Sequence, residues 1–232
     1  MAEGKFIKIP ILDGANSDEG VNFSPTGVDN ETALFNSMFS QRSYAIAPNT
    51  ARKLLALYPD DPANQPPYYI KTPTIFPNKG IQWRRAAAMY GDMVMISGRR
   101  KFCELYAATG QEVYSYRFDT PLWNAAVTDG SKHFVNVVFS FQNISGALGP
   151  LPQYHSYREL SNNIGKAYIS FANDHDPNDS RGNTSTLPYW PRYSLVQPQN
   201  MVLNSNQTYV EEDTWRKEQI DFINTISREL LA

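Results

Sequence analysis

The sequence of 232 residues contains a single cysteine, Cys103, and three histidines. One cysteine closes no disulfide within the chain and cannot form the cysteine pairs of a zinc site. We therefore expect Cys103 to be a free, buried thiol or to have its partner elsewhere. The triplet Asp174-His175-Asp176 has side chains that bind metals, but the proline that follows favours the polar end of a helix. We expect no metal site and no cofactor.

Long apolar runs are also missing. No stretch approaches the roughly 18 apolar residues of a membrane-spanning helix, and the opening Met1-Ala2-Glu3-Gly4-Lys5 lacks the pattern of a signal peptide. The net charge is only −2, and the Lys and Arg residues are scattered along the chain. We therefore expect no transmembrane segment, no signal peptide within this chain and no nucleic-acid partner.

The composition is sufficient for a buried core, with 41% hydrophobic and 13% aromatic residues. The chain also carries more Asn-x-Ser/Thr sequons than the about two or three that its composition gives by chance. This excess favours a full-length protein that enters the secretory pathway. The six sequons begin at Asn22, Asn30, Asn143, Asn178, Asn183 and Asn206.

Local patterns predict three strands and five helices. Apolar and β-branched runs bounded by turn residues predict strands over 5–13, 112–118 and 200–204, with the first ending before the breaker Gly14-Ala15-Asn16. Apolar spacing and end signals predict helices over about 30–38, 50–58, 81–106, 157–174 and 211–231. Asp29 or Asn30 is expected to cap the first helix and Asn49 the second. Acidic residues at 211–213 are expected to favour the N-terminus of the last.

Two loops carry candidate catalytic side chains. Residues 17–23 follow the first predicted strand and place the carboxylates of Asp18 and Glu19 after its carboxyl end, where ligands of open α/β sheets bind. A turn at Gly130-Ser131 places His133 directly before an apolar segment. Taken alone, such residues are more often solvated or hydrogen-bonded parts of loops than catalysts.

Several short motifs occur in one order and together resemble the type B carboxylesterases, the α/β-hydrolase family that includes fungal lipases and the cholinesterases. The segment 14–20 is similar to the acid loop of that family, and the segment 133–141 is similar to its histidine loop. The fungal members look most similar. Further similar segments are Gly91-Asp92, Phe171 to Asn178 and Trp190-Pro191-Arg192-Tyr193.

The resemblance implies an α/β fold with a mostly parallel sheet, flanking helices and a catalytic triad in the chain order serine, glutamate, histidine. By position, Glu19 matches the acid and His133 matches the base. In such a triad the base takes the proton of the serine during attack, and the acid stabilises the resulting imidazolium. The implied substrate is a small-molecule or lipid ester of a carboxylic acid.

The sequence departs from the family because it lacks Gly-x-Ser-x-Gly, which carries the nucleophile, and the Gly-rich oxyanion-hole segment. Ser17, Ser97 and Ser131 lie in no such motif. Residues 1–232 are therefore expected to be the C-terminal portion of the fold, incomplete without an N-terminal half. Alone, such a portion is expected to be inactive. Its unpaired sheet edge is expected to make it marginally stable or prone to aggregate.

Two other interpretations stay open at this stage. Some proteins that resemble this family keep the fold as a non-catalytic binding or adhesion module, although such a module has no need for both the acid loop and the histidine loop. The second interpretation is an unrelated α/β domain whose resemblance is accidental. A Gly-x-Ser-x-Gly motif encoded upstream of Met1 would distinguish the esterase from the binding module.

Overall fold

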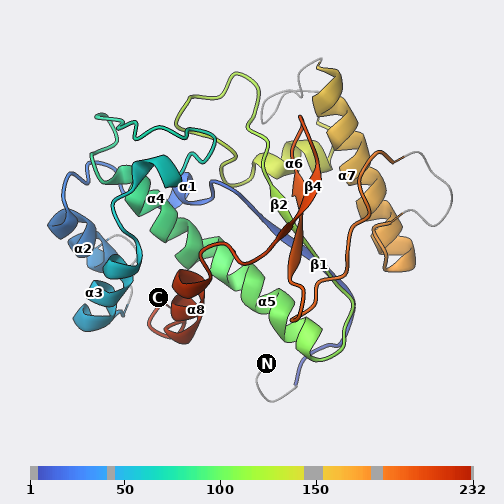
Figure 1. Cartoon of the computed structure of the whole chain (residues 1–232), viewed down its shortest axis with the longest axis horizontal. Helices are drawn as coiled ribbons and strands as arrows, with labels where there is room; N and C mark the ends of the chain where they lie inside the picture. The colour runs from blue at the N-terminus through green and yellow to red at the C-terminus, as the bar shows by residue number, and fades with distance from the viewer. Residues whose placement is uncertain (1–4, 41–44, 144–153, 179–184, 231–232) are drawn as a thin grey trace. The chain divides into compact units, whose positions relative to one another are not determined.

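The computed structural model describes residues 5–40, 45–143, 154–178 and 185–230 (Figure 1). The chain divides into two compact units, each built from segments that are far apart in the sequence. The first, the sheet unit, consists of Met1–Asn16, Arg99–Ala125 and Phe134–Trp215. The second, the helical unit, consists of Ser17–Gly98, Ala126–His133 and Arg216–Ala232.

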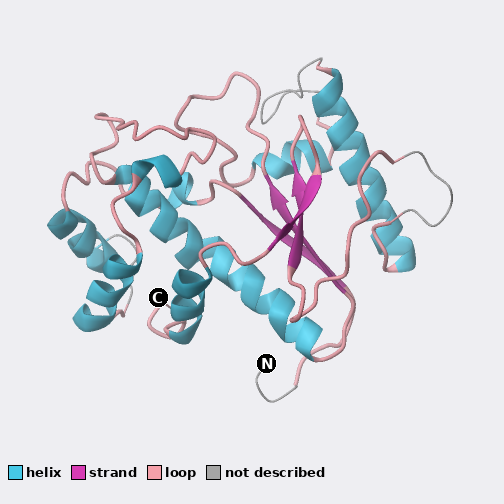
Figure 2. Cartoon of the chain, viewed as in Figure 1, coloured by secondary structure: helices cyan, strands magenta, loops and turns pink. Residues whose placement is uncertain are grey.

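The sheet unit contains a four-stranded sheet in the order β1-β2-β3-β4, coloured magenta in Figure 2. The first three strands run parallel, and β4 is antiparallel to β3. This mostly parallel sheet agrees with the implied fold, and the strands predicted at 112–118 and 200–204 are confirmed. The strands are β1 (Ile11–Asn16), β2 (Val113–Phe118), β3 (Gln199–Leu203) and β4 (Tyr209–Glu212).

Helices pack on both faces of this sheet (Figure 1). Successive side chains of a strand point to opposite faces. Tyr116 and Phe118 of β2 accordingly lie in one apolar cluster with side chains of α6 and α7, whereas Val113 lies in another with Cys103 of α5. The sheet is therefore the middle of three layers. The helices are α5 (Ser97–Ala108), α6 (Val135–Ser140) and α7 (His155–Asp174).

The strand predicted over 5–13 is displaced in the structure, where β1 runs from Ile11 to Asn16. Pro10 has no N–H to donate and lies before the ladder begins. The supposed breaker belongs to the strand, because Gly14, Ala15 and Asn16 all pair with β2. Gly14 is needed there for space, since a Cβ on it would lie 2.4 Å from the ring of Tyr116.

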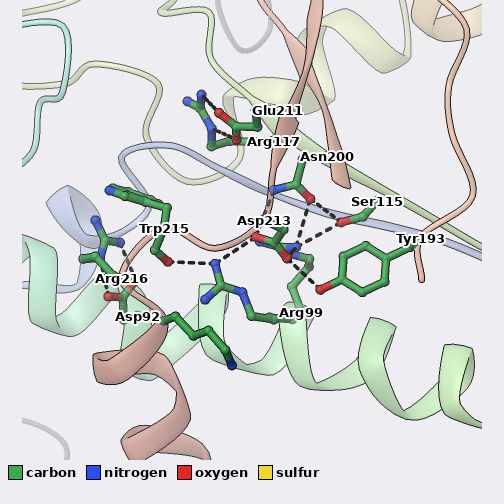
Figure 3. A network of polar contacts seen from close by, with 12 residues as sticks. Asp92, Arg99, Ser115, Arg117, Tyr193, Asn200, Glu211, Asp213, Trp215 and Arg216 are labelled. Carbon is green, nitrogen blue, oxygen red and sulfur yellow. Dashed lines mark hydrogen bonds and ion pairs between the residues drawn. The ribbon is translucent and has the colours of Figure 1, made fainter. Parts of the chain in front are cut away.

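The helix predicted over 211–231 is wrong at its start. Residues 209–212 form β4, and α8 spans only Lys217–Thr225. The acidic residues do not cap a helix, because Glu211 pairs with Arg117 and the buried Asp213 pairs with Arg99 (Figure 3). Burial alone would raise the pKa of Asp213, but the neighbouring arginines outweigh it and hold that pKa below its ordinary range. Tertiary ion pairing thus overrode the local helix signal.

The helical unit packs its helices around one apolar core. The predicted helix over 81–106 is confirmed as a continuous helical segment from Trp83 to Ala108, with a π-helical stretch, η2, in its middle. Its last part, from Arg99, belongs to the sheet unit. The remaining elements here are α1 (Gly20–Phe23), α2 (Glu31–Ser40), α3 (Pro48–Leu57), η1 (Pro62–Asn64), α4 (Trp83–Gly91), η2 (Asp92–Ile96) and α8.

One of the two predicted helix caps is present. The backbone N–H of Ala33 donates to Asn30 Oδ1 over 2.9 Å, so Asn30 caps α2 as expected. The prediction for Asn49 is wrong, because α3 already begins at Pro48 and the Asn49 side chain accepts a hydrogen bond from Arg52 instead. Proline suits the first position of a helix, since its missing N–H would have no helical acceptor there.

The structure also shows where the other residues noted in the sequence lie. Cys103 is free and buried, and burial raises the pKa of its thiol to about 12. His175 terminates α7 in a left-handed conformation with φ of 60°. Within the described ranges, no three His, Cys, Asp or Glu side chains are grouped so that they could hold a metal ion. No helix of the described part of the chain is both long and apolar enough to cross a membrane.

Candidate active site

The acid loop connects the end of β1 to α1. Glu19 directly precedes α1 and is 2% exposed. The first residue of this helix must be glycine, because a Cβ on Gly20 would lie 1.8 Å from the carbonyl oxygen of Ala87 in α4. Gly91 of α4 also approaches this segment closely, since a Cβ on it would lie 2.9 Å from the backbone nitrogen of Gly20. This backbone contact fixes Glu19 against α4.

The histidine loop directly precedes α6, which is the apolar segment noted in the sequence. Gly130 has a positive φ of 52°, which glycine adopts without the steric penalty of a Cβ. Ser131 is 2% exposed, whereas the side chain of His133 is 35% exposed. The loop is thus anchored at Ser131 and opens towards the surface at His133.

The helical unit brings the two sequence candidates together although they are 114 residues apart. His133 Nδ1 lies 2.6 Å from Glu19 Oε2. The ring of Phe23, from the same short helix that follows Glu19, lies against the imidazole with 4.9 Å between the centroids and an interplanar angle of 54°. The imidazole is therefore held by a carboxylate at one nitrogen and by an aromatic ring on one side.

This arrangement has a defined chemical capacity. A carboxylate at 2.6 Å favours the tautomer in which Nδ1 carries the proton, which leaves the lone pair on Nε2. When Nε2 accepts a further proton, the same carboxylate stabilises the cation. Because the Glu19 side chain is only 3% exposed, water screens this interaction weakly. The pair can therefore serve as a general base.

Asp18, the other carboxylate of the acid loop, has a structural role that the sequence did not predict. Its carboxylate accepts a hydrogen bond from the backbone N–H of Tyr68 at Oδ1 and another from that of Ser131 at Oδ2, both over 2.8 Å. Asp18 N–H in turn donates to the carbonyl of Ser131 over 3.0 Å. The sequence shows the carboxylate but not the loops that it joins.

The loop that carries Tyr68 is itself fixed by a buried arginine. The guanidinium of Arg84 in α4 donates to five backbone carbonyls between residues 65 and 72 over 2.5–3.2 Å. Burial lowers the pKa of Arg84. Tyr68 OH contacts Arg216, which forms an ion pair with Asp92 (Figure 3). Tyr68 is thus held at its backbone by Asp18 and at its hydroxyl by Arg216.

The other histidines lie outside this cluster. His155 is on α7 in the sheet unit, with a side chain 91% exposed and its Nδ1 3.4 Å from Glu159. His175 terminates the same helix. Of the serines considered, Ser97 lies within the long helical segment, and Ser17 and Ser131 are 1% and 2% exposed. Glu19 and His133 are therefore brought into direct contact, whereas the other histidines are not part of this cluster.

Comparison with known proteins adds independent evidence. The carboxylesterase family matches residues 1–223. Lipase 2 of Geotrichum candidum is 26% identical over 223 residues, which are 96% of this chain and 36% of that protein. Lipase 4 of Diutina rugosa is 27% identical over 227 residues, with shares of 96% and 37%. Secreted lipase 1 of Botryotinia fuckeliana is 27% identical over 197 residues, with shares of 84% and 31%.

A solved structure agrees with these relatives. The crystal structure of Aspergillus niger EstA superposes with a TM-score of 0.80 at 20% identity, covering 99% of this chain and 42% of that chain. At this identity the superposition shows the fold alone. The chain spans about a third of the length of the curated relatives that it matches. With the family matching almost the whole sequence, the chain belongs to the carboxylesterase family.

Proposed function

We propose that this chain supplies the acid and the base of a serine hydrolase that cleaves carboxylic esters, with Glu19 as the acid and His133 as the base. The single observation that carries the proposal is the 2.6 Å contact between His133 Nδ1 and Glu19 Oε2. Family membership and the lipase names of the relatives support the ester as substrate. In this assignment the nucleophilic serine lies outside the sequence described here.

The reaction follows from the tautomer that Glu19 favours. His133 Nε2 takes the proton of the serine hydroxyl as the serine oxygen attacks the ester carbonyl, and Glu19 stabilises the imidazolium. His133 then returns the proton to the leaving alcohol, which departs and leaves an acyl-enzyme. Water, activated by the same imidazole, hydrolyses the acyl-enzyme. Glu19 keeps its negative charge throughout.

The nucleophile and the oxyanion hole must come from a complementing segment. The chain has no Gly-x-Ser-x-Gly motif, and removing a triad serine leaves only a small residue of catalysis. We therefore expect this chain alone to be inactive. β1 lies at the end of the strand order and has no second neighbour among the described residues. It is one of the two edges at which a complementing strand could pair.

Ester hydrolysis after complementation tests the assignment. The chain is co-expressed with the segment encoded upstream of Met1, and turnover of a p-nitrophenyl ester is measured. His133→Ala should abolish turnover, and Glu19→Gln should lower kcat by about 10²–10⁴-fold because the amide no longer stabilises the imidazolium. His155→Ala, which changes an exposed histidine of the sheet unit, is the matched control and should leave kcat unchanged.

Two results would contradict the proposal. Full activity in His133→Ala or Glu19→Gln would exclude the assigned roles. An upstream segment with another residue in place of the serine, together with no turnover, would favour the non-catalytic binding module instead. The aggregation of the chain with and without the complementing segment is a separate measurement. A monomeric chain with a cooperative melt in isolation would show that β1 needs no added strand.

The full-length protein is proposed to enter the secretory pathway. Its sequons support this, and the name of the Botryotinia relative describes that protein as secreted. Asn22, Asn30 and Asn206 are exposed. Asn178 is a poor acceptor of a glycan, because its side-chain nitrogen donates to Asp176 and to the carbonyl of Trp190. Asn183 lies outside the described residues. Glycopeptide mapping after expression in a secreting host should find Asn178 unmodified.

A further inference from the structure

We infer that Asp18 is a positioning residue of the proposed site, which sets the His133 loop against Glu19 by fastening two backbone segments to one carboxylate. The inference rests on the proposed function and deepens it. The Asp18 residue is buried, with 2% of its surface exposed. A buried carboxylate is costly unless its oxygens accept hydrogen bonds. Here the two carboxylate oxygens accept hydrogen bonds from the two loops that approach the acid loop.

The first connection is reciprocal and joins the acid loop to the histidine loop. Asp18 N–H donates to the carbonyl of Ser131 over 3.0 Å, and Ser131 N–H donates to Asp18 Oδ2 over 2.8 Å. Both bonds lie between the immediate sequence neighbour of Glu19 and a residue two positions before His133. Rotation or slippage of either loop would break both bonds. The 2.6 Å contact between Glu19 and His133 therefore depends on this pair.

The second connection fixes the carboxylate itself. Tyr68 N–H donates to Asp18 Oδ1 over 2.8 Å, so the two oxygens are held by different segments and the carboxylate cannot turn. Gly130 fits against the same group, because a Cβ there would lie 2.3 Å from Asp18 Oδ2. The positive φ of Gly130 and the absence of a side chain are both required for the approach. Only a carboxylate accepts at both ends while fitting this space.

The amide that resembles aspartate in shape cannot replace it. In Asp18→Asn one end of the side chain becomes an NH₂ donor and faces a backbone N–H donor. One of the two loops must then lose its hydrogen bond, whichever way the amide is turned. This hydrogen bond is lost because two donors face each other, and the effect is local. It should loosen His133 without removing either the acid or the base.

The experiment observes the histidine proton in the chain co-expressed with its complementing segment. Histidine side-chain nitrogens are labelled with ¹⁵N, and the Nδ1 proton of His133, identified by its loss in His133→Ala, is followed by NMR. Asp18→Asn should raise its exchange rate with water by about tenfold, the effect of one hydrogen bond lost in the support. Asp129→Asn is the matched control, because Asp129 lies on the same loop but pairs with Lys132. It should leave the exchange rate unchanged.

Four results separate the alternatives. Exchange in folded Asp18→Asn within about twofold of the wild type would overturn the inference while leaving the proposed function intact. If Asp18→Asn does not fold, Gly130→Ala perturbs the same contact from the other side, and an unchanged exchange rate there has the same meaning. Fast amide exchange at Tyr68 or Ser131 in the wild type would also overturn it. Absence of any protected Nδ1 proton in the wild type would instead contradict the proposed Glu19–His133 pair.

A kinetic readout distinguishes positioning from general stability. In the complemented enzyme, Asp18→Asn should lower kcat by about 10–100-fold with little change in KM, since a misplaced base affects the transition state more than substrate binding. Asp129→Asn should change neither constant. A rise in KM with unchanged kcat would contradict the positioning role.

Discussion

The two units bury carboxylates in different ways. In the sheet unit, Asp213 lies between Arg99 and Arg100, with further hydrogen bonds from Tyr193 and Asn200 (Figure 3). In the helical unit, Glu19 is equally buried but its contact is His133, whose imidazole can donate a proton at one ring nitrogen and accept one at the other. Arginine is always charged, so the first arrangement is fixed. The second arrangement leaves a proton that can be transferred, as the proposed general base requires.

Replacing Asp213 should have the largest effect on stability. Asp213→Asn leaves the buried Arg99 and Arg100 without their counter-charge, and breaking a buried ion pair in this way costs about 3–5 kcal/mol of unfolding free energy. Urea unfolding followed by tryptophan fluorescence measures the change. If Asp213→Asn lost as little unfolding free energy as a surface ion pair contributes, the arginines would have found other acceptors. The contrast between the two units would then be wrong.

The pH dependence of stability sharpens the same contrast. Because the arginines hold the pKa of Asp213 below its ordinary value, its contribution is fully present above the pKa of an unfolded aspartate, near 3.8. It is lost as the pH falls through the lower folded value. Wild-type stability should therefore drop steeply on acidification, and Asp213→Asn should reduce that slope. Stability is measured by urea unfolding at each pH from 5 to 2. Equal slopes of stability against pH in the wild type and Asp213→Asn would contradict the coupling between Asp213 and the arginines.

A half-buried ion pair of the sheet unit should give an intermediate effect. Arg117 and Glu211 form a two-point contact at 2.7 and 2.8 Å, with side chains 18% and 25% exposed. Water screens this pair more than the Asp213 cluster, so Glu211→Gln should cost about 1 kcal/mol. The same urea titration measures it. If Glu211→Gln lost as much unfolding free energy as Asp213→Asn, burial would not determine which ion pair contributes more to stability.

The sequence predicted the parts of this molecule that depend on local pattern. Periodicity located the long helical segment and β2, and the motif resemblance located Glu19 and His133. The sequence did not predict β4, because Glu211 and Asp213 resemble the acidic start of a helix until Arg117 and Arg99 are brought to them. The joining role of Asp18 was missed for the same reason. The backbone N–H groups that donate to its carboxylate lie 50 and 113 residues away in the chain.

Replacing Glu19 should have the smallest effect on stability and a large effect on function. Glu19→Gln keeps a side-chain oxygen that can accept from His133 Nδ1, so the unfolding free energy should change by less than about 1 kcal/mol. The neutral amide cannot stabilise an imidazolium, so turnover in the complemented enzyme should still fall. Urea unfolding and ester hydrolysis are measured on the same preparation. A large loss of stability in Glu19→Gln would mean that Glu19, like Asp213, is a charge that stabilises the fold. Loss of turnover without loss of stability would show that the two buried carboxylates have different roles.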